Sequence, residues 1–160
     1  MLRTIVFSLT ALLFAASAQA SFVDMFNGVT VGAPLPKNDL VFLGPAPSTA
    51  NTVQLIDFWA TTCEPCRTSI PKLNAFHQKY GPKGLVMIGV SEESKETVAP
   101  FLEKVPIQYA SAVEGTFSLH KSLRIRALPY AIFVNRSGTI VWRGQPSEIT
   151  GELIESLLAP

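Results

Sequence analysis

The sequence is poor in several residue types on which common functions depend. Its 160 residues include two cysteines and two histidines, and 13 lysine and arginine residues stand against 12 acidic ones. Nucleic-acid binding driven by phosphate contacts needs a strongly basic surface, and the longest basic grouping here is the pair Arg124 and Arg126. We therefore expect no nucleic-acid partner and interpret the arginine pair as solvated surface.

The shortage of cysteine argues against a structural disulfide framework. Small exported domains that rely on disulfides for stability usually carry about four or more cysteines, spread along the chain. Here Cys63 and Cys66 are separated by two residues. A bridge between them would close a loop too short to stabilise the fold much. Reactivity explains this pair better than stability does.

The sequence also lacks the ligands of common metal and haem sites. A zinc site built on the two cysteines needs about two further Cys or His ligands. His77 is expected on a helix away from the cysteines and His120 has no predicted place, so we expect both histidines on the surface and no metal site. Covalent haem attachment requires a histidine directly after the second cysteine, where this chain has Arg67. A redox-active dithiol without another cofactor is the favoured hypothesis, with an inert pair as the alternative.

The first 20 residues have the pattern of a secretory signal. Arg3 supplies a basic start, residues 5–16 form an apolar run, and residues 18–20 read Ala-Gln-Ala, a small-residue cleavage site. We expect cleavage after Ala20 and a periplasmic location. An uncleaved membrane anchor is less favoured, because the apolar run is shorter than the roughly 20 residues of a transmembrane helix.

The remaining sequence predicts one α/β domain at 53–160, preceded by a proline-rich extension at 21–52 with one or two short strands. Apolar periodicity predicts strands at 53–60, 85–90, 107–112, 130–134 and 139–143, and helices at 63–79, 97–104, 115–123 and 148–158. Alternating strands and helices favour parallel pairing, and the hairpin around 135–138 adds antiparallel strands. The expected architecture is a mixed central sheet flanked by helices.

The two cysteines fall where a buried strand gives way to a helix. Unpaired N–H groups and the helix dipole favour a thiolate at the helix N-terminus, so we predict that Cys63 has a lowered pKa and acts as the nucleophile. Cys66 lies one turn further and can resolve a mixed disulfide by closing the intramolecular one. Pro65 suits the first helical turn, whereas the charge of Glu64 opposes the thiolate, so both are candidates for tuning the pair.

Asp57 is the anomaly of the strand that precedes the cysteines. An isolated carboxyl in an apolar strand is expensive to ionise, so we predict that its pKa is raised. Asp57 could then take the proton of Cys66 when that thiol attacks a mixed disulfide. The alternative is an Asp57 that faces solvent at a strand edge and has no part in the chemistry.

Residues 56–66 read Ile-Asp-Phe-Trp-Ala-Thr-Thr-Cys-Glu-Pro-Cys and, with Pro71 five residues later, resemble the active-site segment of thioredoxin. Leu128-Pro129 and the hairpin after it resemble the cis-proline loop of that family, and the similarity covers roughly residue 31 to the C-terminus. The signal pattern, the Glu-Pro dipeptide and Val-Gly-Ala-Pro at 31–34 resemble the TlpA/ResA-like branch of exported thiol-disulfide oxidoreductases. The resemblance implies a thioredoxin fold.

The resemblance also implies site residues that the pattern alone does not. Pro129 would be cis beside the dithiol, with Leu128 offering backbone hydrogen bonds to an extended substrate and Trp59 contributing to the substrate site. An acidic residue, Glu92 or Glu93, would tune the dithiol.

Two positions depart from the branch. Thr62 stands where the family usually has Trp, which removes an aromatic lid from the site. Asp57 is thioredoxin-like, whereas many relatives carry Asn there.

By this resemblance the protein reduces disulfides in extracytoplasmic client proteins, such as apocytochromes c, and receives its electrons from a membrane thiol-disulfide donor. We expect a monomer. A disulfide oxidase or isomerase would use the same residues in the opposite direction. A Cu(I)-handling assembly factor, with the two thiolates as soft ligands, is the alternative from another functional class.

Overall fold

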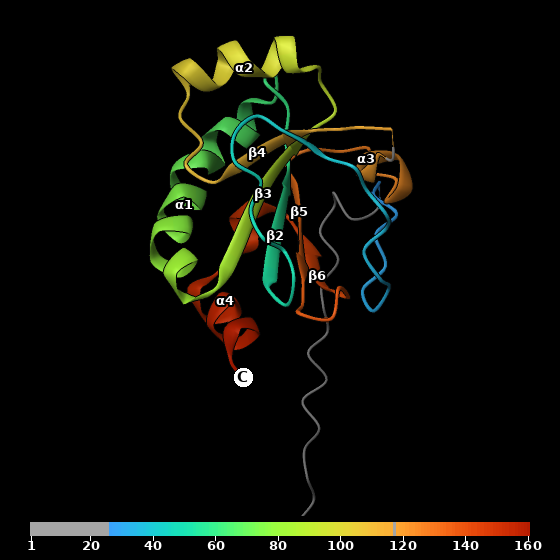
Figure 1. The fold of residues 1–160 in the computed structure, drawn as a ribbon, viewed down its shortest axis with the longest axis vertical. Coiled ribbons are helices and arrows are strands. Elements are labelled where there is room, and N and C mark those ends of the chain that lie inside the picture. The colour runs from blue at the N-terminus through green and yellow to red at the C-terminus, as the bar shows by residue number, and fades with distance from the viewer. Residues whose placement is uncertain (1–25, 117) are drawn as a thin grey trace, which may run out of the picture.

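The computed structural model describes residues 26–116 and 118–160, and the predicted signal lies outside this part. A six-stranded sheet forms its centre, with the strand order β1-β4-β3-β2-β5-β6 (Figure 1). The strands are β1 (Val41–Phe42), β2 (Val53–Phe58), β3 (Leu85–Ser91), β4 (Ala110–Val113), β5 (Tyr130–Val134) and β6 (Ile140–Gly144). β2, β3 and β4 run parallel, while β1, β5 and β6 pair antiparallel with their neighbours. The predicted mixed sheet is confirmed.

Helices surround the sheet (Figure 1). The α-helices are α1 (Glu64–Tyr80), α2 (Lys95–Lys104), α3 (Leu119–Ser122) and α4 (Gly151–Leu158), and 3₁₀ turns are η2 (Gly81–Lys83) and η3 (Pro146–Glu148). Among the described residues, no helix combines the length and hydrophobicity needed to cross a bilayer.

Three elements start three or more residues later than predicted, and side-chain hydrogen bonds explain each late start. β4 starts at Ala110 rather than 107, because the N–H of Gln108 donates to the side chain of Asn74 on α1. α3 starts only after Ser118, whose hydroxyl accepts from the N–H of Lys121. α4 starts after Thr150, which caps it in the same way, and Glu148 belongs to the separate turn η3 rather than to this helix.

Alternation along β2 directs its side chains to two separate cores. On one face, covered by α1 and α4, the buried residues include Val53, Leu55, Leu73, Met87, Phe133 and Ile154. On the other face, which packs against α3 and the N-terminal segment, they include Val29, Ile56, Phe58, Val90, Leu119 and Ile132. All six residues of β2 are buried, so the strand lies at the centre of the fold.

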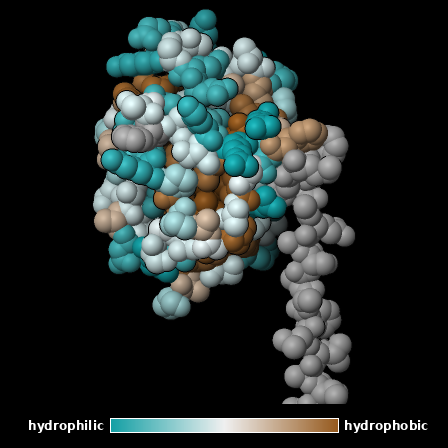
Figure 2. Space-filling view, turned by 90° about the vertical axis from the view of Figure 1, so that its right-hand side faces the viewer, coloured by the Kyte–Doolittle hydropathy of each residue, from teal (hydrophilic) through white to brown (hydrophobic). Residues whose placement is uncertain are grey.

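The N-terminal segment before β1 is tied to the hairpin of β5 and β6. The N–H of Gly32 donates to the carbonyl of Ile140, and the N–H of Ile140 donates to the carbonyl of Ala33, at 2.8 and 2.9 Å. The face that carries this segment and α3 shows apolar side chains between polar ones (Figure 2). This extension is therefore part of the folded structure from residue 27 onward.

Gly89 lies next to Asp57 in the sheet and leaves room for two aromatic rings. A Cβ at this position would come within 3.0 Å of Trp59 Nε1 and 3.1 Å of Tyr109 Cε2. Gly89→Ala should therefore lower the free energy of unfolding by about 1–3 kcal/mol through overpacking. Urea denaturation measures this change in the free energy of unfolding.

Gly44→Ala is the matched control, because a Cβ there meets nothing within 4 Å. We expect this control to change stability by less than about 0.5 kcal/mol. Equal effects of the two substitutions would show that the rings do not pack against Gly89 as described.

Candidate redox site

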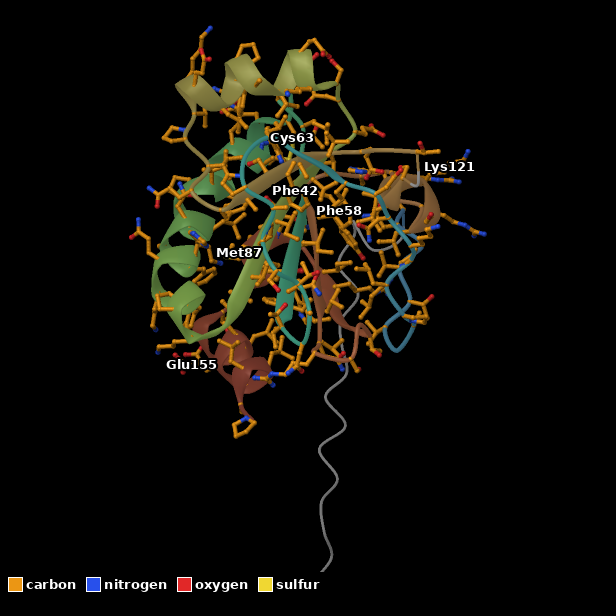
Figure 3. All side chains as sticks on the ribbon, in the orientation of Figure 1. Phe42, Phe58, Cys63, Met87, Lys121 and Glu155 are labelled. Carbon is orange, nitrogen blue, oxygen red and sulfur yellow. A yellow bond between two sulfur atoms is a disulfide. The ribbon has the colours of Figure 1, made fainter. Side chains whose placement is uncertain are left out.

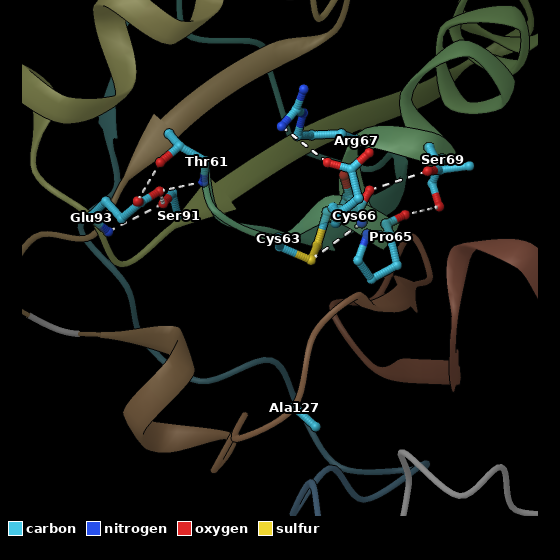
Figure 4. The surroundings of a disulfide bond; sticks show 12 residues. Thr61, Cys63, Pro65, Cys66, Arg67, Ser69, Ser91, Glu93 and Ala127 are labelled. Atoms are coloured by element: carbon cyan, nitrogen blue, oxygen red, sulfur yellow. Dashed lines mark hydrogen bonds and ion pairs between the residues drawn. A yellow bond between two sulfur atoms is a disulfide. The ribbon is translucent and has the colours of Figure 1, made fainter.

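Cys63 and Cys66 form a disulfide at the N-terminus of α1, with a Cα–Cα distance of 5.3 Å (Figures 3 and 4). Cys63 is the N-cap residue, and its Sγ accepts a hydrogen bond from the N–H of Cys66 at 3.2 Å. A sulfur in this position receives a donor that the helix itself cannot satisfy. Cys63 is half-buried and Cys66 is buried, so Cys63 is the more accessible sulfur for a partner.

The loop between β2 and Cys63 is held by Glu93 (Figure 4). Its carboxylate accepts hydrogen bonds from both the backbone N–H and the hydroxyl of Thr61, each at 2.7 Å. The hydroxyl of Ser91 donates to the same carboxylate at 3.1 Å. Glu92 is exposed. Of the two predicted acidic residues, Glu93 is thus the one that contacts the active-site loop, and its effect on the dithiol stays a prediction.

An apolar cluster supports the disulfide from inside. Trp59, Cys66, Val98 and Val113 are buried together, with Cys63, Phe101 and Leu128 packed against them. The Trp59 ring is 2% exposed and lies 5.4 Å from the ring of Phe101. The resemblance implied that Trp59 contributes to the substrate site. Its side chain instead packs beneath the dithiol and offers no surface to a substrate.

The Leu128–Pro129 peptide bond is cis, as the resemblance implied. Leu128 belongs to the same apolar cluster as the two cysteines, which brings this loop to the site. The residues before it are held by Asn27, whose side-chain oxygen accepts from the N–H groups of Arg126 and Ala127 at 2.6 and 3.1 Å. Asn27 is 6% exposed. Sequence reasoning missed it, because nothing in the extension marked one asparagine as buried.

Asp57 is buried on the α1 face of the sheet, 3% exposed, between Gly89 of β3 and Ala131 of β5. Burial raises the pKa of Asp57 to about 7, and the hydrogen bond from Tyr109 Oη, at 2.9 Å, works in the lowering direction. The predicted rise in pKa is confirmed, and the alternative of a solvent-facing carboxylate is wrong. A carboxyl that is half ionised near neutral pH can accept and release a proton.

The two tuning candidates within the motif lie at the surface. Glu64 pairs with Arg67 at 3.0 Å, with 74% and 46% of their side chains exposed. Such an exposed pair contributes little to stability. Pro65 is exposed in the first turn of α1. Pro65 lies beside the disulfide (Figure 4), and the influence of Glu64 and Pro65 on its chemistry stays a prediction.

The expectation for the histidines was wrong for His120. It is 4% exposed, its Nδ1 lies 2.8 Å from Glu114 Oε1, and its ring stands edge-on to Phe58. Burial raises the pKa of Glu114, but hydrogen bonds from His120 and Ser118 outweigh it, and the pKa is lowered overall. The part of the chain that the structure describes contains no cluster of three or more metal-ligating side chains.

With this geometry in place, comparison with known proteins decides the family. Residues 47–143, more than half of the chain, match the AhpC/TSA family. The chain belongs to this family. Its sequence is 26% identical over 98 residues to the thiol-disulfide oxidoreductase ResA of Bacillus thuringiensis, covering 61% of this chain and 54% of ResA. It is 29% identical over 120 residues to the protein DipZ of Mycobacterium tuberculosis, covering 71% of this chain and 17% of DipZ.

This AhpC/TSA family member also has close structural neighbours. The thioredoxin domain of a thiol-disulfide oxidoreductase of Bacteroides vulgatus superposes with a TM-score of 0.69 at 22% identity, over 82% of this chain and 99% of that one. The match shows that the fold is that of thioredoxin. The chain spans about half the length of the ResA protein that it matches.

The pKa of Asp57 makes stability depend on pH. The folded state holds the proton up to a pH of about 7, whereas the unfolded state releases it near the ordinary value of 3.8. Stability therefore falls as pH rises through this window, and it levels off above it. Asp57→Asn cannot ionise, so at pH 8 the variant should be more stable than the wild type by up to about 4 kcal/mol, at roughly 1.4 kcal/mol per pH unit. Denaturant unfolding of the oxidised protein between pH 4 and pH 8 measures this difference.

Glu103→Gln, at an exposed carboxyl, is the control and should change stability by the same small amount across the range. A stability difference for Asp57→Asn that does not grow with pH would contradict the raised pKa.

Proposed function

We propose that this protein is an exported thiol-disulfide oxidoreductase that reduces disulfides in client proteins. The observation that carries the proposal is the position of Cys63, whose sulfur caps α1 and accepts a backbone hydrogen bond while its partner Cys66 is buried. A cap position stabilises negative charge on sulfur, and a thiolate is the species that attacks a disulfide. The similarity to ResA supports the same chemistry.

The reaction begins from the reduced protein. The Cys63 thiolate attacks one sulfur of a client disulfide, forms a mixed disulfide and releases the other client sulfur as a thiolate, which takes a proton from solvent. Cys66 then loses its proton to Asp57 and attacks Cys63. The bond between Cys63 and the client breaks, and the second client sulfur leaves as a thiolate that takes a proton from solvent. The client is now a dithiol, and the protein holds the Cys63–Cys66 disulfide. Two electrons pass from protein to client in each cycle.

The surroundings of the disulfide suit an extended client segment. Leu128 lies next to the dithiol in the apolar cluster and directly precedes the cis Pro129. Before the strand β5 starts at Tyr130, the backbone at this position can pair with a client chain in an extended conformation. Main-chain pairing of this kind selects for accessible cysteines on flexible segments rather than for one side-chain sequence.

The cellular setting forms part of the same proposal. The signal pattern in residues 1–20 supports export to the periplasm with cleavage after Ala20. A reductase outside the cytoplasm needs a supply of electrons, for which we propose a membrane thiol-disulfide donor. Candidate clients are proteins whose cysteine pairs must be reduced before use, such as apocytochromes c, and the monomer is the proposed working unit.

Trapping of the mixed disulfide tests the proposal. Cys66→Ser leaves the attacking sulfur without a resolving thiol, so the variant should accumulate a covalent adduct with a disulfide-containing client such as insulin. Cys63→Ser should give no adduct, because the buried Cys66 is inaccessible to the client. Non-reducing electrophoresis and mass spectrometry measure the adducts.

The wild type, which completes the cycle, should reduce insulin with dithiothreitol as the electron source and show no lasting adduct. Adducts of equal yield in both single-cysteine variants would contradict the assignment of the two sulfurs. Absence of adduct in Cys66→Ser would contradict the proposed activity.

A further inference from the structure

The side chain of Tyr109 contacts the buried carboxyl of Asp57. Tyr109 directly precedes β4, and its hydroxyl donates a hydrogen bond to Asp57 Oδ2 at 2.9 Å. The ring is 4% exposed and packs in the core beneath α1. Gly89 makes this approach possible, since a Cβ there would come within 3.1 Å of the ring. The tyrosine thus reaches the carboxyl across the neighbouring strand.

In residues 26–116 and 118–160, few other titratable groups lie near Asp57. Its neighbours in the sheet, Gly89 and Ala131, carry no titratable side chain. On the same face, α1 brings Cys66 and His77, whose ring lies 6.4 Å from that of Tyr109.

The titratable group that α4 brings to this face is Glu155, which accepts a hydrogen bond from Tyr80 Oη. α2 contributes the apolar side chains of Val98, Phe101 and Leu102. Within the described residues, the Asp57 carboxyl accepts a hydrogen bond from the Tyr109 hydroxyl.

The tyrosine also borders open space. A surface hollow of about 360 Å³ is lined by Tyr109 together with His77, Leu43, Ile107, Gln108 and Ser111. Asp57 does not line this hollow. Tyr109 therefore contacts the Asp57 carboxyl with its hydroxyl and lines the hollow with another part of its side chain. In this position it separates Asp57 from the water in the hollow.

We propose that Tyr109 is a positioning residue for the resolving step, and that it controls the ionisation of Asp57 in two opposing ways. Its hydroxyl stabilises the carboxylate by donating a hydrogen bond, while its ring excludes the water of the hollow, which would stabilise the carboxylate more. This inference rests on the proposed role of Asp57 as the acceptor of the Cys66 proton.

The pKa values of Asp57 and Tyr109 agree with this combination of burial and hydrogen bonding. The pKa of Asp57 is about 7, because burial raises it and the hydrogen bond lowers it. The pKa of Tyr109 is raised well above its usual range by burial and by the nearby carboxyl, so the hydroxyl keeps its proton throughout. In the resolving step the proton moves from Cys66 sulfur to Asp57, and Tyr109 donates to the carboxylate without losing its own proton.

Two substitutions at one position separate the two effects. Tyr109→Phe keeps the ring and loses the hydroxyl, so Asp57 should ionise at a pH about one to two units higher. Tyr109→Ala removes the ring as well as the hydroxyl, so water from the hollow can reach Asp57. Asp57 should then ionise at a lower pH than in the wild type. A residue with a purely structural role would not shift the pH dependence in opposite directions.

The readout is the reaction of the reduced protein with 5,5′-dithiobis(2-nitrobenzoate), followed by stopped-flow absorbance. The first release of nitrothiobenzoate reports the attack by Cys63, and the second reports resolution by Cys66. The pH midpoint of the second phase should rise in Tyr109→Phe, with a slower rate at pH 7, and should fall in Tyr109→Ala.

Tyr80→Phe is the matched control, because Tyr80 is also buried on this face and also donates to a carboxylate, that of Glu155. Its second phase should keep the wild-type midpoint. If the pH midpoint of the second phase in Tyr109→Phe equals that of the wild type, the inference is wrong. If Tyr109→Ala does not fold, the result for Tyr109→Phe is sufficient to test the inference. Loss of the first phase in the wild type would instead overturn the proposed function.

Discussion

The site depends on the point where β2 ends and α1 begins. β2 is buried along its whole length between β3 and β5, so its last residue has a fixed position in the sheet. Four residues of loop separate Phe58 from the N-cap Cys63, and Glu93 fixes that loop through Thr61. The helix then supplies a backbone donor to the Cys63 sulfur. A change that loosens this junction would move the reactive sulfur away from its donor.

The same strand also carries a buried carboxyl, Asp57, whose raised pKa is useful for proton transfer. Its alternation places Asp57 on the face that α1 covers, where ionisation is unfavourable and the pKa rises to about 7. A fully apolar strand would be more stable near neutral pH, because no buried carboxylate would form there. The carboxyl instead provides a group that can take up and lose a proton at neutral pH, on the sheet face that packs against the helix carrying both cysteines.

Local sequence patterns predicted the parts of the site that are local in the chain. The apolar run of β2, the cysteines at the helix start and the turn before β6 are each encoded within about ten neighbouring residues, and the structure has them at the predicted places. The contacts that complete the site are not local. Tyr109 is 52 residues from Asp57, and Asn27 is 99 residues from Arg126.

Such pairings depend on the sheet order and on small residues such as Gly89 that leave room for them, and one sequence carries no mark of either. The same reason explains the error at His120, whose burial depends on Phe58 and Glu114 from two separate strand ends. The resemblance to thioredoxin predicted the cis bond before Pro129 because that feature belongs to the family and not to the local pattern.

The reduction potential of the Cys63–Cys66 pair tests the proposed direction of electron flow, from this protein to its clients. The mature protein would be equilibrated with dithiothreitol or glutathione buffers of known potential, and the reduced fraction measured by thiol alkylation. We expect a single two-electron transition near that of thioredoxin, about −270 mV, or lower. A value near about −120 mV would make the protein an oxidant and contradict the proposed direction of electron flow.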